Sequence, residues 1–143
     1  MTTVRQLLDG KSPEVHAVGP DTAVIEAIRL MAEKSIGAVL VMDGPVLAGI
    51  LSERDYARKI VLRDRSSRDT QVEEIMTAKL VTVAPTAHVA HCLQMVTDHR
   101  IRHLPVVENG KVLGVISIGD LVKAVIDAQA QELEQLQQYI VAG

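Results

Sequence analysis

An internal repeat is the feature that most constrains the fold of this 143-residue chain. Residues 49–55 (Gly-Ile-Leu-Ser-Glu-Arg-Asp) recur as residues 114–120 (Gly-Val-Ile-Ser-Ile-Gly-Asp), 65 positions later. The ungapped match extends back to Pro20 and its counterpart Pro85. A repeated unit that cannot bury its apolar face alone can bury it against its copy. The repeat therefore predicts one domain of two halves, related by a pseudo-two-fold axis.

Each half is expected to contain the same elements. Apolar residues at i, i+3, i+4 and i+7 predict a helix over 22–34 and a matching helix in the second copy. Apolar runs flanking Asp43-Gly44-Pro45 and Asn109-Gly110 predict two hairpins. The expected hairpin strands cover 38–42, 46–51, 104–107 and 112–116. Each unit is preceded by a short helix and a short strand, expected at 4–8 and 15–18 in the first copy and at 72–76 and 80–83 in the second. A further helix closes each unit, and in the first copy it is expected at 53–62.

These elements define an α/β fold of two repeats, each ordered β-α-β-β-α, followed by an extended C-terminal helix. We place the first repeat at 1–65, the second at 66–127 and the helix extension at 128–143. Residues 63–71 are polar and lack an apolar period, so we interpret them as the linker.

The last helix is expected to run from Asp120 towards Ile140 with an apolar stripe along it. Ile126, Leu133 and Ile140 lie seven residues apart, and Val122 and Leu136 extend the same line. Two interpretations are open: the stripe packs on its own domain, or it pairs with a second copy in a dimer.

Composition narrows the classes of partner. The chain has no Phe, no Trp and a net charge of -3, so the aromatic platforms and basic surface of single-stranded nucleic-acid binders are lacking. No apolar run approaches the roughly 20 residues that a membrane helix needs. The first six residues do not resemble a secretion signal and Cys92 is the single cysteine, which together predict a cytoplasmic protein.

The duplicated Ser-x-x-Asp motif has two interpretations. In one, Ser52 or Ser117 caps a helix, and the acid three residues later completes a capping box. In the other, the helix N-terminus attracts a phosphate group, the serine hydroxyl bonds a phosphate or ribose oxygen, and Asp55 or Asp120 accepts both hydroxyls of a ribose. Local sequence alone favours the capping box.

The motifs together resemble a tandem pair of cystathionine β-synthase (CBS) domains, the arrangement called a Bateman module, here standing alone as in signal-transduction proteins. The resemblance covers 4–125. It depends on the two Gly-x-x-Ser-x-x-Asp segments, on 72–77 (Val-Glu-Glu-Ile-Met-Thr) and on 101–107 (Ile-Arg-His-Leu-Pro-Val-Val), all in the family's order and spacing.

The resemblance implies two clefts between the halves that bind a regulatory adenosine-containing ligand: AMP, ADP, ATP or NAD, with S-adenosylmethionine ranked lower. The two aspartates would hold ribose hydroxyls, aliphatic side chains would enclose the adenine, and backbone groups near Ala38 and His103 would bond its edge. The implied first site consists of Val18, Ala38, Val39, Ser52, Arg54, Asp55 and Thr77. The implied second site consists of Val83, His103, Leu104, Pro105, Ser117 and Asp120.

The two sites are not expected to be equivalent. Arg54 inside the first motif suits a charged phosphate tail, although a solvated helix face is the alternative, and the second motif has Gly119 at this position. The second site would have to borrow charge, with Arg100, Arg102 and His103 as candidates.

Catalysis and metal binding find little support. His88, His91 and His99 with Cys92 do not form a closed metal-ligand set, and Cys92 falls on a buried stripe where the pKa of its thiol should be raised. Phosphate-binding loops, nucleophile elbows and zincin motifs are absent from the sequence. We therefore expect no enzyme and no metal, but a homodimeric regulatory module that signals to a partner protein. A structural or adaptor dimer with vestigial sites is the alternative, and a nucleotide-consuming enzyme is a further one.

Overall fold

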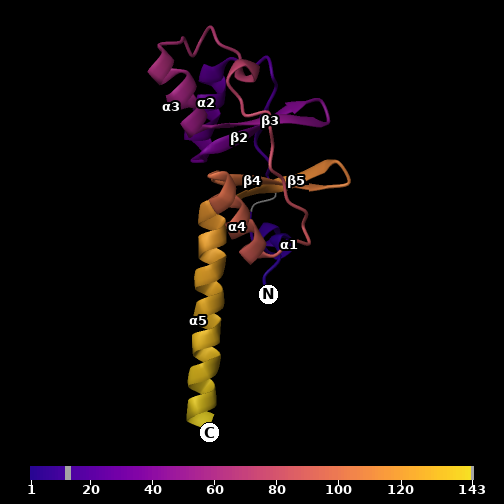
Figure 1. Cartoon of the computed structure of the whole chain (residues 1–143), viewed down its shortest axis with the longest axis vertical. Coiled ribbons are helices and arrows are strands. Elements are labelled where there is room, and N and C mark those ends of the chain that lie inside the picture. The colour runs from indigo at the N-terminus through magenta and orange to yellow at the C-terminus, as the bar shows by residue number, and fades with distance from the viewer. Residues whose placement is uncertain (12–13, 143) are drawn as a thin grey trace. The chain divides into compact units, whose positions relative to one another are not determined.

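The computed structural model describes residues 1–11 and 14–142 (Figure 1). Within this part of the chain, one sheet has the order β1-β2-β3 and a second pairs β4 with β5. The α/β class, the two hairpins and the long last helix are confirmed. The elements are α1 (Val4–Asp9), β1 (Ala17–Val18), α2 (Val24–Lys34), β2 (Ala38–Asp43), β3 (Val46–Ser52), α3 (Glu53–Lys59), η1 (Val61–Arg63), η2 (Val72–Glu74), α4 (Val89–His99), β4 (His103–Glu108), β5 (Lys111–Ser117) and α5 (Ile118–Ala142).

The elements gather into two compact units. One contains β1, α2, β2, β3, α3, η1 and η2, and the other contains α1, α4, β4, most of β5 and α5. In the first unit, α2 packs its apolar stripe on the sheet, and Ala27, Met31, Val39 and Leu51 share one buried core. The aliphatic stripe read from the sequence is therefore the side of the helix that faces the sheet.

The segments before the two repeats, residues 2–11 and 70–79, are here called the lead-ins. Each lead-in belongs to the compact unit of the other repeat, so the two are exchanged. The N–H of Val24, which opens α2, donates to the Thr70 carbonyl, and the N–H of Val89, which opens α4, donates to the Thr2 carbonyl. These are matching bonds, because Val24 and Val89 are 65 residues apart and Thr2 and Thr70 are 68 apart, as the repeat requires. Each lead-in thus supplies an acceptor to the helix start of the other repeat, where backbone donors lack helical partners.

Two glycines accommodate these exchanged segments. A Cβ at Gly49 would lie 2.7 Å from the Met76 sulfur and 2.9 Å from the Thr77 carbonyl oxygen. A Cβ at the equivalent Gly114 would lie 2.9 Å from Cδ2 of Leu8. Leu8 and Met76 occupy matching positions in the two lead-ins, so the repeated glycine is the place where each strand admits the lead-in of the other repeat.

The predicted linker does more than connect the repeats. The carbonyls of Ser67 and Thr70 accept from the first two N–H groups of α2, and Thr70 is 4% exposed. Arg65 pairs with Glu74 at 2.7 Å. The polar stretch therefore caps α2, whose N-cap residue Ala23 has a side chain that cannot accept a hydrogen bond.

The predicted strand at 80–83 is wrong, because among the described residues only Val83 makes a bridge there, in parallel with Val106. In the first repeat the N–H of Leu40 donates to the His16 carbonyl at 3.1 Å and extends the pairing. The residue equivalent to Leu40 is Pro105, which has no N–H to donate. The lead-in strand is also shorter than predicted in the first repeat, where β1 covers Ala17–Val18.

Candidate functional site

The first motif lies where β3 gives way to α3. The Ser52 hydroxyl accepts from the Asp55 N–H at 3.1 Å, and the Asp55 carboxylate accepts from the Ser52 N–H at 3.0 Å. This is a complete capping box, so the structural interpretation of the motif holds at this helix. A matching bond from the N–H of Glu53 to the Gly37 carbonyl fixes the junction beside the start of β2.

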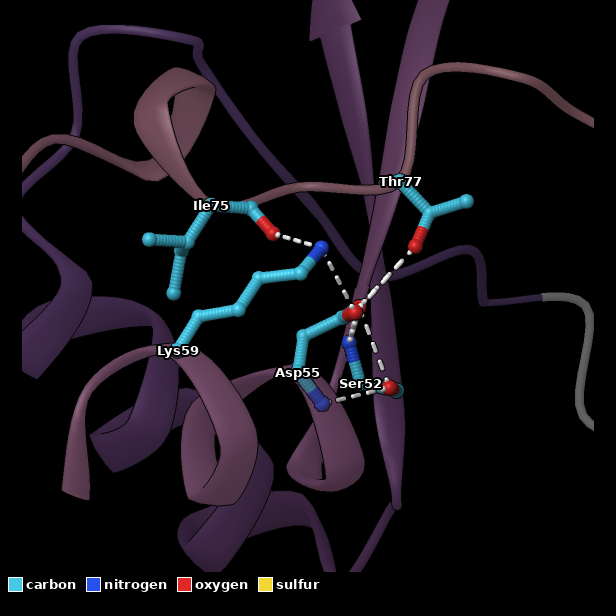
Figure 2. Close-up of polar contacts among 5 residues, drawn as sticks. All are labelled: Ser52, Asp55, Lys59, Ile75 and Thr77. Carbon is cyan, nitrogen blue, oxygen red and sulfur yellow. Dashed lines mark hydrogen bonds and ion pairs between the residues drawn. The ribbon is translucent and has the colours of Figure 1, made fainter. Parts of the chain in front are cut away.

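The Asp55 carboxylate does more than cap the helix, as Figure 2 shows. It accepts from the Thr77 hydroxyl at 3.2 Å, and Lys59 Nζ lies 3.1 Å from Oδ1. Lys59 also donates to the Ile75 carbonyl at 2.9 Å. Asp55 is 9% exposed, and its two oxygens are occupied by protein donors from α3, the β3 end and the exchanged lead-in. This carboxylate can offer bonds to a ligand only if one of those donors moves.

The second motif repeats the capping box at the junction of β5 and α5. The Ser117 N–H donates to the Asp120 carboxylate at 2.9 Å, and the Asp120 N–H donates to the Ser117 hydroxyl at 3.1 Å. The N–H of Ile118 donates to the Arg102 carbonyl, as Glu53 does to Gly37 in the first repeat. The sequence repeat is therefore also a repeat of hydrogen bonds.

A different lysine reaches the second carboxylate. Lys11 Nζ lies 2.6 Å from Asp120 Oδ2 and donates to the Val115 carbonyl at 2.9 Å. Burial of Asp120 opposes its charged form, but the hydrogen bond from Lys11, the Ser117 N–H and the Lys11 charge outweigh burial and lower the pKa of Asp120. Asp120 is therefore held ionised, with a side-chain exposure of 26%.

The two sites differ in where their donors come from. Thr77 has Asp9 as its counterpart in the other lead-in, and a carboxylate cannot donate to Asp120 as the Thr77 hydroxyl does to Asp55. Lys59 has Ala124 as its counterpart, so the charge at the second site comes from Lys11. The two aspartates therefore have different surroundings, while the expected difference between the ligand sites stays a prediction.

The structure groups the residues expected for the first site within one unit. Ala38 pairs with Ser52 across the β2–β3 ladder, which places the start of β2 beside the motif. Val39 is 1% exposed and belongs to the core, while Val18 on β1 pairs with Val41. Arg54 lies in the first turn of α3 and is half-buried. Asp55 contacts both Ser52 and Thr77, and Ala38 pairs with Ser52.

The residues expected for the second site also share one unit. Val83 donates its N–H to the Pro105 carbonyl at 3.0 Å, so the segment before α4 is joined to β4 of the same repeat there. Leu104 is fully buried and His103 is half-buried. Ser117 and Asp120 are in contact with each other, and their added partner is Lys11.

Sequence reasoning missed the two Lys–Asp ion pairs. The sequence signal for Lys59 was present, because it lies four residues after Asp55 on one helix. Lys11 is 109 residues from Asp120, and only the exchange of lead-ins brings the two together.

Other candidate chemistry is weaker in the described residues. They contain no group of three or more His, Cys, Asp and Glu side chains arranged to hold a metal ion. Burial raises the pKa of the Cys92 thiol, as predicted. Among these residues, no helix combines the length and apolar character needed to cross a bilayer.

With this geometry in place, comparisons with known proteins assign the family. The CBS domain model matches residues 4–62 and 72–127, so the chain belongs to the CBS-domain family and is a CBS domain pair, a regulatory module. It is 43% identical over 128 residues to the CBS domain-containing protein CBSX3, mitochondrial, of Arabidopsis thaliana, a match that covers 86% of this chain and 62% of that protein.

Solved structures give the same assignment. A candidate signal-transduction protein with CBS domains from Burkholderia ambifaria MC40-6 is 54% identical, with a TM-score of 0.87 over 90% of this chain and 96% of that one. The CBS domain pair of protein MJ0100, solved with 5′-methylthioadenosine and S-adenosyl-L-methionine, has a TM-score of 0.77 over 89% of this chain and 98% of that one. It is 22% identical, so this likeness concerns the fold alone.

Proposed function

We propose that this CBS domain pair is a regulatory sensor of adenine nucleotides, in which each repeat binds the adenosine part of a ligand. AMP, ADP, ATP and NAD are the candidates, and S-adenosylmethionine ranks below them. The observation that carries the proposal is the duplicated Ser–Asp pair at a strand-to-helix junction, in each case with a lysine ammonium on the carboxylate.

The ion pairs suggest how a ligand is recognised. Ribose hydroxyls are neutral donors that can take the place of a lysine on Asp55 or Asp120. The displaced Lys59 or Lys11 then has its charge available for a phosphate group, while the ribose hydroxyls supply hydrogen bonds to the carboxylate. Ser52 and Ser117 contribute hydroxyls at the helix N-termini, where the backbone also favours an anion.

The remaining residues of each site shape the adenine environment. In the first repeat these are Val18, Ala38 and Val39, with Thr77 beside the ribose and Arg54 towards the phosphates; in the second they are Val83, His103, Leu104 and Pro105. Val39 and Leu104 are buried, so their contribution is the packing that holds the backbone of β2 and β4 in place. Backbone donors and acceptors near Ala38 and His103 bond the adenine edge.

The module signals without catalysis. A ligand shifts a conformational equilibrium only if it binds two arrangements with different affinity, and the partner protein detects that difference. We propose a homodimer that acts in the cytoplasm; the mitochondrial location in the name of the Arabidopsis relative belongs to that protein. The division into 1–65, 66–127 and 128–143 stays a prediction.

Binding is tested by calorimetry and thermal shift with AMP, ADP, ATP, NAD and S-adenosylmethionine. A ligand at one hundred times its Kd stabilises the folded state by about 2.7 kcal/mol, which raises the melting temperature measurably. If none of the five ligands binds, the sensor assignment is wrong, and the adaptor role with vestigial sites takes its place. Conversion of a nucleotide during long incubation, followed by chromatography, would instead indicate an enzyme.

Matched variants assign the sites. Asp55→Asn should remove one binding event and leave the other, and Asp120→Asn should do the reverse. Glu53→Gln and Asp127→Asn are the controls, because these carboxylates lie on the same two helices and are exposed. Equal loss of both events in either variant would contradict the assignment of one site to each repeat.

A further inference from the structure

The apolar stripe of α5 is uncovered in this chain. Among the described side chains of the helix, the last buried ones are Leu121 and Ala124, and all those from Gln129 to Val141 are exposed. The interpretation in which the stripe packs on its own domain is therefore wrong. The exposed fractions along the stripe are 46% for Val122, 58% for Ile126, 57% for Leu133, 55% for Leu136 and 67% for Ile140.

A helix of this kind needs a partner. Isolated helices of up to about 12–15 residues are marginal in water even when their sequence favours helix, and most helices depend on packing of an apolar face. Residues 129–141 have no such packing within the described part of the chain. An apolar stripe that stays in water also costs the free energy that its burial would release.

The spacing specifies the kind of partner. With Ile126, Leu133 and Ile140 at position a of a heptad, Val122, Gln129 and Leu136 fall at position d. β-Branched residues at a with leucine at d favour a parallel two-stranded coiled coil, and Ile126, Ile140 and Leu136 fit this pattern, whereas Leu133 at a departs from it. We infer that α5 forms such a coiled coil, in register, with α5 of a second copy of this chain. The inference is independent of ligand binding.

Gln129 favours an identical partner in the same register. It is the one polar residue on the d line between Val122 and Leu136, and in a parallel pair it meets Gln129 of the partner subunit. Two side-chain amides can donate to and accept from each other, whereas an amide buried against an apolar side chain loses its hydrogen bonds. A single buried polar residue at position a, such as asparagine, specifies register and oligomeric state in coiled coils, and we infer the same role for Gln129 at position d.

The charges favour the parallel arrangement. Glu132 is at position g, where a parallel pair sets it beside Gln137 of the partner subunit. An antiparallel pair that stacks Leu133 against Gln129 of the partner subunit would bring two Glu132 side chains together, which is unfavourable. Asp127 and Glu134 are at position b and face away from the seam.

The same charges exclude a lipid surface as the occupant. Helices that lie on membranes carry Lys or Arg on their polar face. Beyond Lys123 the sequence of α5 has only acidic charges, at Asp127, Glu132 and Glu134, and anionic headgroups would repel them.

Disulfide trapping in the full chain tests the geometry. In a Cys92→Ala background, Gln129→Cys should form an intermolecular disulfide rapidly on mild oxidation, visible on a non-reducing gel and reversed by dithiothreitol. Gln131→Cys is the matched control, because it lies at position f on the outer face and should cross-link at least tenfold more slowly. The inference is overturned if Gln129→Cys forms no intermolecular disulfide, or if Gln131→Cys forms one at the same rate.

A second measurement separates the α5 contact from any association of the repeats themselves. Leu133→Glu should abolish trapping at position 129, while Glu134→Gln at position b should leave it unchanged. Light scattering of the wild-type chain should give the mass of a dimer at micromolar concentration. A monomer mass assigns the stripe to a different protein, and trapping that survives Leu133→Glu shows that contacts other than the stripe bring the two helices together; either result overturns the inference.

Discussion

Gly49 and Gly114 provide a quantitative test of the exchanged lead-ins. The two glycines occupy equivalent positions in the two repeats, yet the Cβ of an alanine would meet different atoms at each of them. At Gly49 one of them is the backbone carbonyl of Thr77, at 2.9 Å, and at Gly114 the closest is Cδ2 of the Leu8 side chain, also at 2.9 Å. A side-chain terminus can rotate away, whereas the Thr77 carbonyl is held by the N–H of Ile50 at 3.0 Å.

The expected magnitudes follow from this difference. Overpacking a well-filled core costs about 1–3 kcal/mol, and we expect Gly49→Ala at the upper end because the backbone must shift. At Gly114 the cost of moving the Leu8 side chain is offset by about 0.4–1 kcal/mol, because alanine lowers the conformational entropy of the unfolded chain. The net loss in the free energy of unfolding of Gly114→Ala should therefore be below about 1 kcal/mol. For a chain of this size, 2–3 kcal/mol lowers Tm by roughly 4–12 °C.

Urea denaturation followed by circular dichroism measures both free energies of unfolding. Gly10→Ala is the control, since its Cβ would lie 3.6 Å from the nearest atom, the Leu7 carbonyl oxygen, in ordinary contact. The control should stay within about 0.5 kcal/mol of the wild type. Gly114→Ala that destabilises as much as Gly49→Ala, or Gly49→Ala that behaves like the control, would refute this account of the two lead-ins.

Three further predictions concern single side chains. Lys11→Met should lower the free energy of unfolding by up to about 1 kcal/mol at pH 7, whereas Lys79→Met, at the exposed counterpart in the repeat, should not. Because folding lowers the pKa of Asp120 from 3.8, the Lys11 effect is full above that pH and should shrink in urea titrations taken from pH 5 to pH 2. An effect that grows over this range would contradict the ion pair. Ser52→Ala and Ser117→Ala should each lower the stability of the fold by about 1 kcal/mol in thermal unfolding, because each removes a helix cap. Ser66→Ala is the control, since its hydroxyl accepts from the Asp69 N–H in the linker and caps no helix. Equal losses in all three variants would argue against the caps. Burial raises the pKa of the Cys92 thiol, so its reaction with a thiol reagent at pH 8 should be slow in the folded protein and fast in urea, and a fast reaction in the native state would show that the thiol is accessible.

The sequence was sufficient for those features that local patterns and the repeat determine. Apolar periodicity predicted α2 and α4, and the Asn109-Gly110 turn, with φ of 52° and 77° in the structure, predicted the second hairpin. The Ser–Asp pairs were predicted together with their capping role, because both partners lie within one helical turn.

The features that the sequence missed depend on which copy a segment contacts. A repeat offset shows that 4–9 and 72–77 are equivalent, but it does not show that each packs in the unit of the other repeat. Lys11 was missed for this reason. The strand at 80–83 failed for a local reason that the comparison of copies could have supplied, since Pro105 replaces the donor Leu40.

The exchanged lead-ins bear on the origin and the divisibility of the chain. When two copies of an ancestral repeat swap their N-terminal arms, each finished unit contains an arm from the other molecule, and joining the two genes end to end yields the connectivity seen here. A fragment that ends at residue 65 would carry its own arm but lack the one that caps α2 at Thr70 and bridges to Ile50 of β3 at Thr77. Neither half is therefore a whole on its own, and the two fragments should regain structure only when they are mixed.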